Sequence, residues 1–178
     1  MEAAAQEIAR LQEKLSRLQA ELRTPLEEEA LRTDPIRILT GRVGGKRIAL
    51  LLQSISEVVA MPEVSVLPEA PSWVTGLLDL RGRLIPVIDV EARIARGSRT
   101  ARASDFVVVY AEREVPVGLV VSGIENVEAL AADQFVEPPP DVPLAPYVLR
   151  VARDRRGTSL LLSIERLVCT SELPPVPG

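Results

Sequence analysis

The fold is decided by residues 73–90, which read Trp73-Val74-Thr75-Gly76-Leu77-Leu78-Asp79-Leu80-Arg81-Gly82-Arg83-Leu84-Ile85-Pro86-Val87-Ile88-Asp89-Val90. The second half of this stretch, residues 84–90, is apolar and rich in β-branched side chains, which predicts a strand. Gly76 and Gly82 interrupt the stretch where the backbone has to turn. The stretch therefore predicts a strand at residues 84–90 that is preceded by backbone turns.

Similar short apolar runs lie on both sides of this stretch. Residues 36–40 and 47–52 flank Val43-Gly44-Gly45-Lys46, where the two glycines supply the positive φ angles of a hairpin turn. Further strands are predicted at residues 106–111, 115–121, 147–152 and 159–164, and proline is densest between them at residues 137–143. Many short strands with such punctuation favour a sandwich or small barrels over a doubly wound sheet.

The body of the chain also repeats itself. Residues 48–58 resemble residues 117–127, with apolar positions coinciding at an offset of 69. Residues 87–91 resemble residues 161–165 at an offset of 74. Two pairs of similar segments in the same order predict a body made of two similar lobes.

The N-terminal segment has a different period. Apolar residues spaced alternately three and four apart form a helical seam: Ile8, Leu11, Leu15, Leu18 and Leu22. Thr24-Pro25-Leu26-Glu27 then predicts a new short helix, which ends before Asp34-Pro35. We therefore expect a helical extension at residues 1–35, a β body at residues 36–172 and a short proline-rich tail at residues 173–178.

Composition excludes several classes of function. The 178 residues include no histidine, which rules out histidine bases, histidine metal ligands and phosphohistidine relays. The net charge of −4 argues against nucleic-acid binding. The carboxylates of Glu57, Asp79, Asp89 and Asp105 have no spacing that places two at one site, so no acid–base pair, metal or cofactor is predicted. Without a signal peptide or an apolar run of ~20 residues, the expected location is the cytoplasm.

Several motifs together resemble the CheW family of chemotaxis coupling proteins. Residues 70–90 are similar to its signature of a proline, then a glycine, Asn-Leu-Arg-Gly and an apolar strand containing proline and aspartate. Ile55-Ser56-Glu57-Val58 resembles its apolar-x-Glu-apolar element, and residues 117–124 and 159–168 resemble its later strands. The likeness covers roughly residues 36–170, in the family's order and spacing.

The resemblance implies two small five-stranded β-barrels that share one hydrophobic core, here preceded by an N-terminal α-helix. It implies no catalytic activity. It implies an adaptor that joins the cytoplasmic tip of a chemoreceptor to the regulatory domain of a CheA-type histidine kinase. The extension at residues 1–35 is absent from typical members, and its seam would dimerise, bind a partner coiled coil or fold back onto a barrel.

The resemblance also assigns candidate interface residues. Glu57 and Arg81 match a surface pair beside the receptor and kinase contacts, and Leu52, Ile55 and Phe106 match apolar positions of the receptor groove. The alternative is that these three apolar residues are simply buried in the core. Asp79 stands where the family has asparagine and adds a negative charge beside Arg81.

Two alternatives to coupling stay open. One is a variant of the same fold that fills or competes for array positions without activating the kinase. The other is a coiled-coil structural protein whose barrels only stabilise an oligomer.

Overall fold

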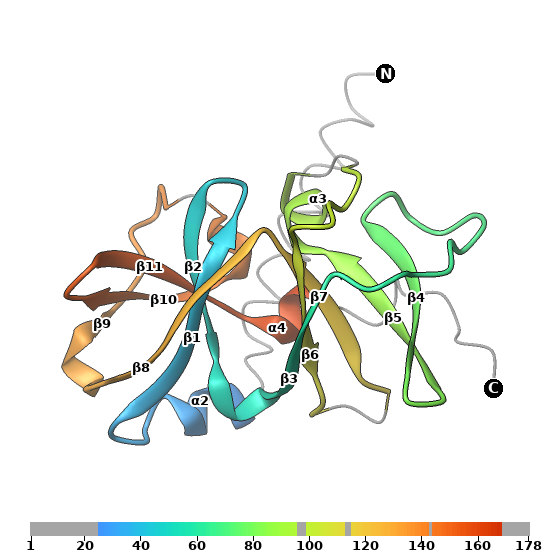
Figure 1. The fold of residues 1–178 in the computed structure, drawn as a ribbon. Helices are drawn as coiled ribbons and strands as arrows, with labels where there is room; N and C mark the ends of the chain where they lie inside the picture. The colour runs from blue at the N-terminus through green and yellow to red at the C-terminus, as the bar shows by residue number, and fades with distance from the viewer. Residues whose placement is uncertain (1–24, 96–98, 113–114, 143, 169–178) are drawn as a thin grey trace.

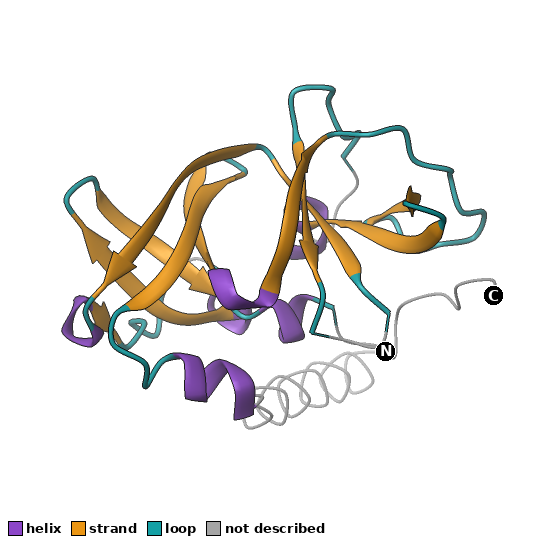
Figure 2. Cartoon of the chain, turned by 60° about the horizontal axis from the view of Figure 1, so that its bottom comes forward, coloured by secondary structure: helices purple, strands orange, loops and turns teal. Residues whose placement is uncertain are grey.

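The computed structural model describes residues 25–95, 99–112, 115–142 and 144–168. This part of the chain is mainly β, as predicted, and its strands form two sheets that lie next to each other (Figure 1). The strands are β1 (Ile36–Val43), β2 (Lys46–Leu51), β3 (Ile55–Ala60), β4 (Val74–Leu80), β5 (Arg83–Asp89), β6 (Phe106–Tyr110), β7 (Val117–Val121), β8 (Gly123–Leu130), β9 (Phe135–Val136), β10 (Val148–Asp154) and β11 (Gly157–Leu162). The helices within these described residues are all short (Figure 2): α2 (Pro25–Ala30), α3 (Val90–Ala95), α4 (Ile164–Leu167) and the 3-10 turns η1 (Leu52–Ser54), η2 (Ala132–Gln134) and η3 (Ala145–Tyr147).

The two sheets differ by one strand. The first has the order β8-β1-β2-β11-β10-β9 and the second the order β3-β6-β7-β5-β4. Five strands were expected in each lobe, and the second sheet has five. The first has a sixth because the two-residue strand β9 pairs with β10, with Val136 opposite Val151.

The hairpin predicted around Gly44-Gly45 is confirmed. β1 and β2 pair from Ile38 opposite Leu51 to Val43 opposite Lys46. Gly44 and Gly45 have φ angles of 54° and 75°, in the left-handed region that a two-residue hairpin turn requires.

The core has three parts, one inside each sheet and one between them. Inside the first sheet lie buried residues such as Ile38, Leu51 and Leu161, and inside the second lie Ile85 and Val107. The largest cluster lies between the sheets and is shared by both lobes. Its buried members are Leu39, Val43, Ile48, Leu50, Trp73, Ile88, Val90, Ala92, Val108, Tyr110, Val117, Leu119, Val121, Val148, Leu162, Ile164, Leu167 and Val168. The predicted shared core is therefore present, and each lobe has its own interior as well.

Strand β7 shows why the inner strands are continuous apolar runs. Val117, Leu119 and Val121 face the shared core, whereas Val120 faces the interior of the second sheet. Since both faces are covered, every residue of the strand is buried.

The predicted internal repeat is present as matched strand pairs. Each sheet contains one parallel pair, with Ala49 of β2 opposite Leu161 of β11 and Gly118 of β7 opposite Val87 of β5. Gly118 lies 69 residues after Ala49, and Leu161 lies 74 residues after Val87. These are the two offsets that relate the repeated segments of the sequence. In each pair a small residue faces a large aliphatic one, so the two lobes pack alike.

The lobes exchange one edge strand each. β3 follows β2 of the first sheet along the chain but pairs with β6 in the second. β8 follows β7 of the second sheet but pairs with β1 in the first. Neither lobe can therefore be removed without taking an edge strand from the other.

The short helix predicted after Thr24 is confirmed as α2. Its residue Ala30 is buried in the interior of the first sheet, and its Glu27 is 5% exposed. The seam residues Ile8, Leu11, Leu15, Leu18 and Leu22 lie outside the described residues, and the domain boundaries at residues 35 and 172 stay predictions.

Candidate functional site

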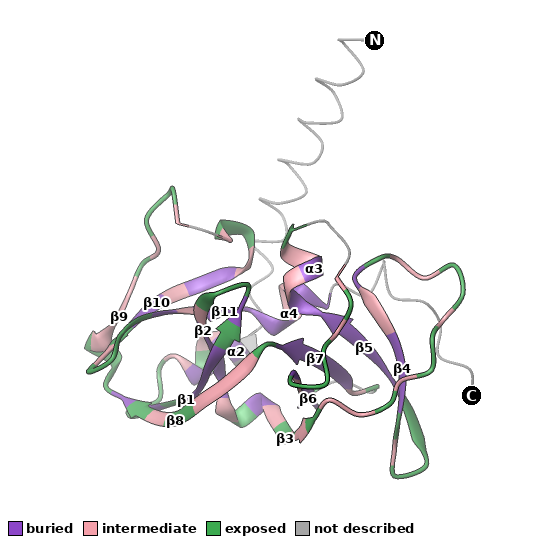
Figure 3. Ribbon diagram, turned by 45° about the horizontal axis from the view of Figure 1, so that its top comes forward, coloured by how far each residue is buried: buried purple, intermediate pink, exposed green. Residues whose placement is uncertain are grey.

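A two-residue turn between β4 and β5 forms an exposed tip of the second sheet (Figure 3). Its residues Arg81 and Gly82 have φ angles of 56° and 84°. Two successive positive φ angles match the hairpin turn whose twist fits the flanking strands. The Asp79 carboxylate accepts a hydrogen bond of 2.7 Å from the Gly82 backbone N–H, which braces the turn.

Arg81 and Glu57 form the ion pair that the resemblance implies. The Arg81 guanidinium lies 3.0 Å from the carboxylate of Glu57 on β3, which is the edge strand at the other end of the strand order of this sheet. The Arg81 side chain is 80% exposed and that of Glu57 is 23% exposed. An ion pair so open to water contributes about 0–1 kcal/mol to folding, so stability does not account for it. Its charges are available to a partner.

The charge of Asp79 is directed into the turn. The carboxylate that replaces the family's asparagine binds the Gly82 N–H, and the described residues give it no ion pair with Arg81. Leu84, which lies opposite Asp79 on β5, is 39% exposed and adds an apolar contact surface beside the turn. Asp79 therefore positions the tip.

The predicted apolar groove residues do not gather at one place. Leu52, Ile55 and Phe106 are all partly buried against the shared core. Leu52 and Ile55 lie at the crossover from the first sheet to the second, with Ile55 opposite Tyr110 of β6. Phe106 lies at the other end of β6, opposite Ala60. A groove role for these three residues stays a prediction.

Arg99 is a half-buried arginine whose role the sequence pattern did not reveal. Its guanidinium lies 2.9 Å from Asp89 and 2.9 Å from Asp105, whose side chains are nearly fully buried. Burial raises the pKa of Asp89, although the Ala92 N–H and Arg99 act in the opposite direction. The structure thus brings together two carboxylates whose spacing had predicted no common site, and the arginine between them gives the group a structural role.

Arg47 forms a second such network in the first sheet. It lies 2.7 Å from Glu125, 3.3 Å from Glu128 and 2.6 Å from Asp154, and only 11% of its side chain is exposed. The hydrogen bond from Arg47 lowers the pKa of Glu125. The pKa of Asp154 is also lowered, because its bonds from Arg47 and the Arg156 N–H outweigh the effect of burial. The network joins three strands that are distant in sequence.

A third group of polar residues lies where α2 meets α4. The Ser163 hydroxyl donates to the Glu27 carboxylate at 2.8 Å and accepts from the Arg166 N–H. Burial raises the pKa of Glu27 despite that hydrogen bond. The Tyr110 hydroxyl donates to Glu165, and burial followed by this bond raises the tyrosine pKa. The Glu27–Ser163 contact holds α2 against the start of α4, and the Tyr110–Glu165 contact holds α4 against β6.

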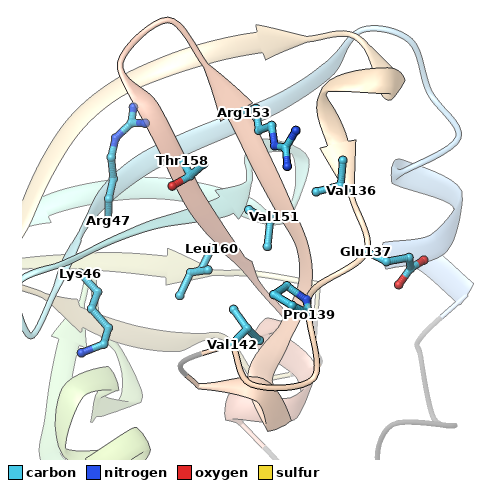
Figure 4. A pocket seen from close by; sticks show the side chains of 10 residues that line it. All are labelled: Lys46, Arg47, Val136, Glu137, Pro139, Val142, Val151, Arg153, Thr158 and Leu160. Carbon is cyan, nitrogen blue, oxygen red and sulfur yellow. The ribbon is translucent and has the colours of Figure 1, made fainter.

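The first sheet carries a pocket of about 690 Å³ on its outer side (Figure 4). Val136, Val151 and Leu160 line it with apolar surface. Lys46 and Arg153 stand on different sides of this surface in Figure 4, and both are exposed. The sequence had marked the neighbouring residues 137–143 only as a proline-rich loop.

Two further features of the described residues concern metal ligands and membrane-spanning helices. These residues contain no group of three or more cysteine, aspartate or glutamate side chains that could hold a metal ion. Among the helices that the structure describes, none reaches the length and hydropathy needed to cross a bilayer.

Comparisons with known proteins agree with this architecture. The probable chemotaxis protein CheW of Rhizobium etli is 23% identical over 137 residues, which cover 76% of this chain and 83% of that protein. Protein PilI of Pseudomonas aeruginosa is 28% identical over 109 residues, 60% of this chain and 61% of PilI. The crystal structure of the scaffolding protein TtCheW of Thermoanaerobacter tengcongensis matches with a TM-score of 0.67 and 23% identity, over 76% of this chain and 89% of that one. A family model described as the CheW-like domain matches residues 37–172, and the chain therefore belongs to the CheW-like domain family.

Proposed function

We propose that this chain couples the cytoplasmic tip of a chemoreceptor to the regulatory domain of a CheA-type histidine kinase in a bacterial chemosensory array. Proteins of its family are scaffold adaptors without enzymatic activity. The observation that carries the proposal is the exposed Glu57–Arg81 pair on a braced hairpin tip. The family resemblance matches this pair to a surface beside the partner contacts.

An adaptor needs more than one docking surface, and we assign one to each partner. The exposed Glu57–Arg81 tip lies on the second sheet, whereas Leu52 and Ile55 lie where the chain crosses from the first sheet to the second. We assign the tip, with Asp79, to the kinase contact. Leu52, Ile55 and Phe106 are assigned to the receptor contact. The place of action is the cytoplasm, at the receptor array.

A direct test is pull-down of the kinase regulatory domain and of a receptor cytoplasmic fragment by the full chain. Arg81→Glu places two negative charges at the tip, so kinase binding is expected to fall by about tenfold or more, since arginine anchors dominate many interfaces. The double change Glu57→Arg with Arg81→Glu restores the intramolecular pair in reverse and separates its loss from the loss of a contact to the kinase.

The matched control is Arg155→Glu. Arg155 occupies the corresponding turn of the β10–β11 hairpin in the first sheet and is also exposed. The same charge reversal there is expected to leave kinase binding unchanged. If the wild-type chain binds neither the kinase domain nor any receptor fragment, the coupling proposal is wrong.

The variant that occupies array positions without activating the kinase is the second candidate. Asp79 in place of asparagine at the tip, and the likeness to protein PilI, favour considering it. Reconstituted phosphorylation separates the two functions. A coupling protein supports receptor-controlled kinase activity, whereas an occupying variant binds the kinase and lowers the activity that a cognate coupling protein supports.

The coiled-coil structural alternative is tested by light scattering. The molecular mass of the full chain is compared with that of a chain lacking residues 1–24. If both proteins form particles with the same number of chains, the seam is excluded as an oligomerising element.

A further inference from the structure

A second pocket, of about 520 Å³, lies beside the proposed receptor contact. One wall comes from the segment that joins α2 to β1, and the other comes from the end of β2 and from η1. Its lining residues are Ala30, Thr33, Pro35, Ile36, Arg37, Leu51, Leu52 and Gln53. Leu52 belongs both to this pocket and to the predicted receptor groove, so a partner that reaches Leu52 also meets the α2–β1 segment.

The wall contributed by the α2–β1 segment is held in place from two sides. Ala30 is 3% exposed and packs inside the first sheet. Glu27, one turn earlier, accepts hydrogen bonds of 2.8 and 3.1 Å from the Ser163 hydroxyl. The Thr33 N–H then donates to the Ala30 carbonyl at 3.2 Å. A wall fixed in this way is preformed, which reduces the entropy lost when a partner binds.

The pocket joins an apolar lining to one cation. Of its described lining residues only Arg37 is charged, and the alternation of β1 turns its side chain outward between the buried Ile36 and Ile38. The described residues form no ion pair with Arg37, whereas Arg42 on the same strand pairs with Glu125. An apolar cavity beside an unpaired arginine is complementary to a partner surface on which an apolar side chain and an acidic side chain lie next to each other.

We propose that the α2–β1 segment is part of the receptor-binding surface and selects the receptor. An amphipathic helix of the receptor tip that docks on Leu52 places an apolar side chain in this pocket and a carboxylate against Arg37. This inference rests on the proposed coupling function, because it takes the receptor contact at Leu52 as given. It goes further by giving the segment before the β body a direct part in recognition.

The test measures the affinity of the full chain for a cytoplasmic fragment of the cognate chemoreceptor that includes its tip. Arg37→Glu reverses the charge at the mouth, and Gln53→Trp fills the pocket from the exposed η1. Each is expected to weaken receptor binding by about fivefold or more, and added salt should narrow the effect of Arg37→Glu because an exposed charge pair is screened. Arg32→Glu is the matched control, since Arg32 is exposed on the same segment but does not line the pocket.

The kinase arm of the same experiment separates the outcomes. All three variants should bind the kinase regulatory domain as the wild type does, which shows that they are folded. If the wild type binds the receptor fragment and Arg37→Glu and Gln53→Trp bind it equally well, the inference is overturned and coupling stands. Equal losses in Arg37→Glu and Arg32→Glu also overturn it, because they indicate only a general charge effect. If the wild type binds no receptor fragment, coupling and this inference fall together.

Discussion

Gly118 shows how closely single residues are constrained in this core. It lies in the middle of β7, and a Cβ added there would come within 2.8 Å of Val107 Cγ1 and 3.1 Å of Val87 Cγ2. Both neighbours are β-branched and stiff, so neither can turn aside without leaving its preferred rotamer. Ala49, which holds the matching place in the first sheet, already has a Cβ, so the space allowed differs between the lobes.

We predict that Gly118→Ala destabilises the protein by about 1–3 kcal/mol, the usual cost of overpacking a filled core. Urea denaturation measures the free energy of unfolding. Gly123→Ala is the control, because the nearest atom to its added Cβ, Arg42 Cβ, is 4.0 Å away. A double change of Gly118→Ala with Val107→Ala should cost less than the sum of the two. Additive losses would show that contact with Val107 is not the cause.

Glu27 is a buried carboxylate whose pKa is raised. Burial raises the pKa above the ordinary value of 4.5, and the charge of Glu165 acts in the same direction, while hydrogen bonds from Ser163 and the Glu165 backbone and the charge of Arg166 act to lower it. The buried Tyr110 hydroxyl also lies near enough to interact with Glu27. Because the folded-state pKa is raised, the neutral carboxyl stabilises the fold fully below its unfolded-state pKa. This contribution is lost as the pH rises through the folded-state value.

We therefore predict that Glu27→Gln removes one pH-dependent contribution to the free energy of unfolding. The variant should gain stability relative to wild type as the pH rises from about 4 to about 8, since the amide keeps an acceptor for Ser163 and carries no charge. Urea denaturation at a series of pH values measures this difference. For Glu29→Gln, an exposed change on the same helix, the difference in free energy of unfolding from wild type should be the same at every pH. If the difference for Glu27→Gln is also independent of pH, burial of a charge at residue 27 does not affect the stability of the protein.

The β4–β5 hairpin is the element on which the proposed function depends. Its turn needs positive φ at both Arg81 and Gly82, and only Gly82 meets this need without steric cost. Nothing lies within 4 Å of a Cβ added at Gly82, so only the backbone conformation opposes a side chain there. Arginine at the first position is therefore not explained by turn stability, which agrees with a binding role.

We predict opposite effects for two changes in this turn. Arg81→Asn should leave the free energy of unfolding unchanged or raise it by up to about 0.5 kcal/mol, because asparagine tolerates positive φ, yet it should weaken kinase binding. Gly82→Val should cost about 1–2 kcal/mol, because a branched residue is strained in the left-handed region. Thermal unfolding and kinase pull-down together measure both. Unchanged kinase binding by Arg81→Asn would contradict a role for the guanidinium.

Strand position explains which elements could be predicted. The runs predicted as strands correspond to β1, β2, β5, β6, β7, β10 and β11, which are the inner strands of the two sheets. The four that were not predicted as strands, β3, β4, β8 and β9, are the edge strands. An inner strand buried on both faces is a continuous apolar run, whereas β3 alternates between half-buried and exposed residues. Edge strands thus lack the pattern on which the prediction relied.

Across the molecule as a whole, two arginine networks join different elements. Arg47 ties β2 to β8 and β10, which are far apart in sequence, whereas Arg99 ties Asp89 at the end of β5 to Asp105 just before β6. Their carboxylate partners are nearly fully buried at Asp154, Asp89 and Asp105. Removing either arginine would leave a buried charge without its partner.

We predict that Arg47→Met costs about 3–5 kcal/mol near neutral pH, the usual penalty for breaking a buried ion pair from one side. The lowered pKa of Asp154 gives the sign of the pH dependence. Its stabilisation is present above the unfolded-state pKa and is lost as the pH falls through the folded-state value, so the loss caused by Arg47→Met should shrink in acid. Urea denaturation at several pH values measures this. Arg42→Met, which removes a half-exposed partner of Glu125, should cost far less.

Two properties could be predicted from the sequence alone: histidine chemistry is excluded, and the β architecture is repeated. The lack of histidine, the apolar inner strands, the Gly-Gly turn and the two offsets of the repeat are visible without coordinates, because each is a feature of composition or of short segments. The assignment of each edge strand to its sheet needed the three-dimensional structure. The same is true of the carboxylates that Arg47 gathers from β8 and β10, and of the pocket that is lined by both Ala30 of α2 and Leu52. These arrangements depend on segments that are distant in sequence, and contacts between such segments leave no periodic pattern in it.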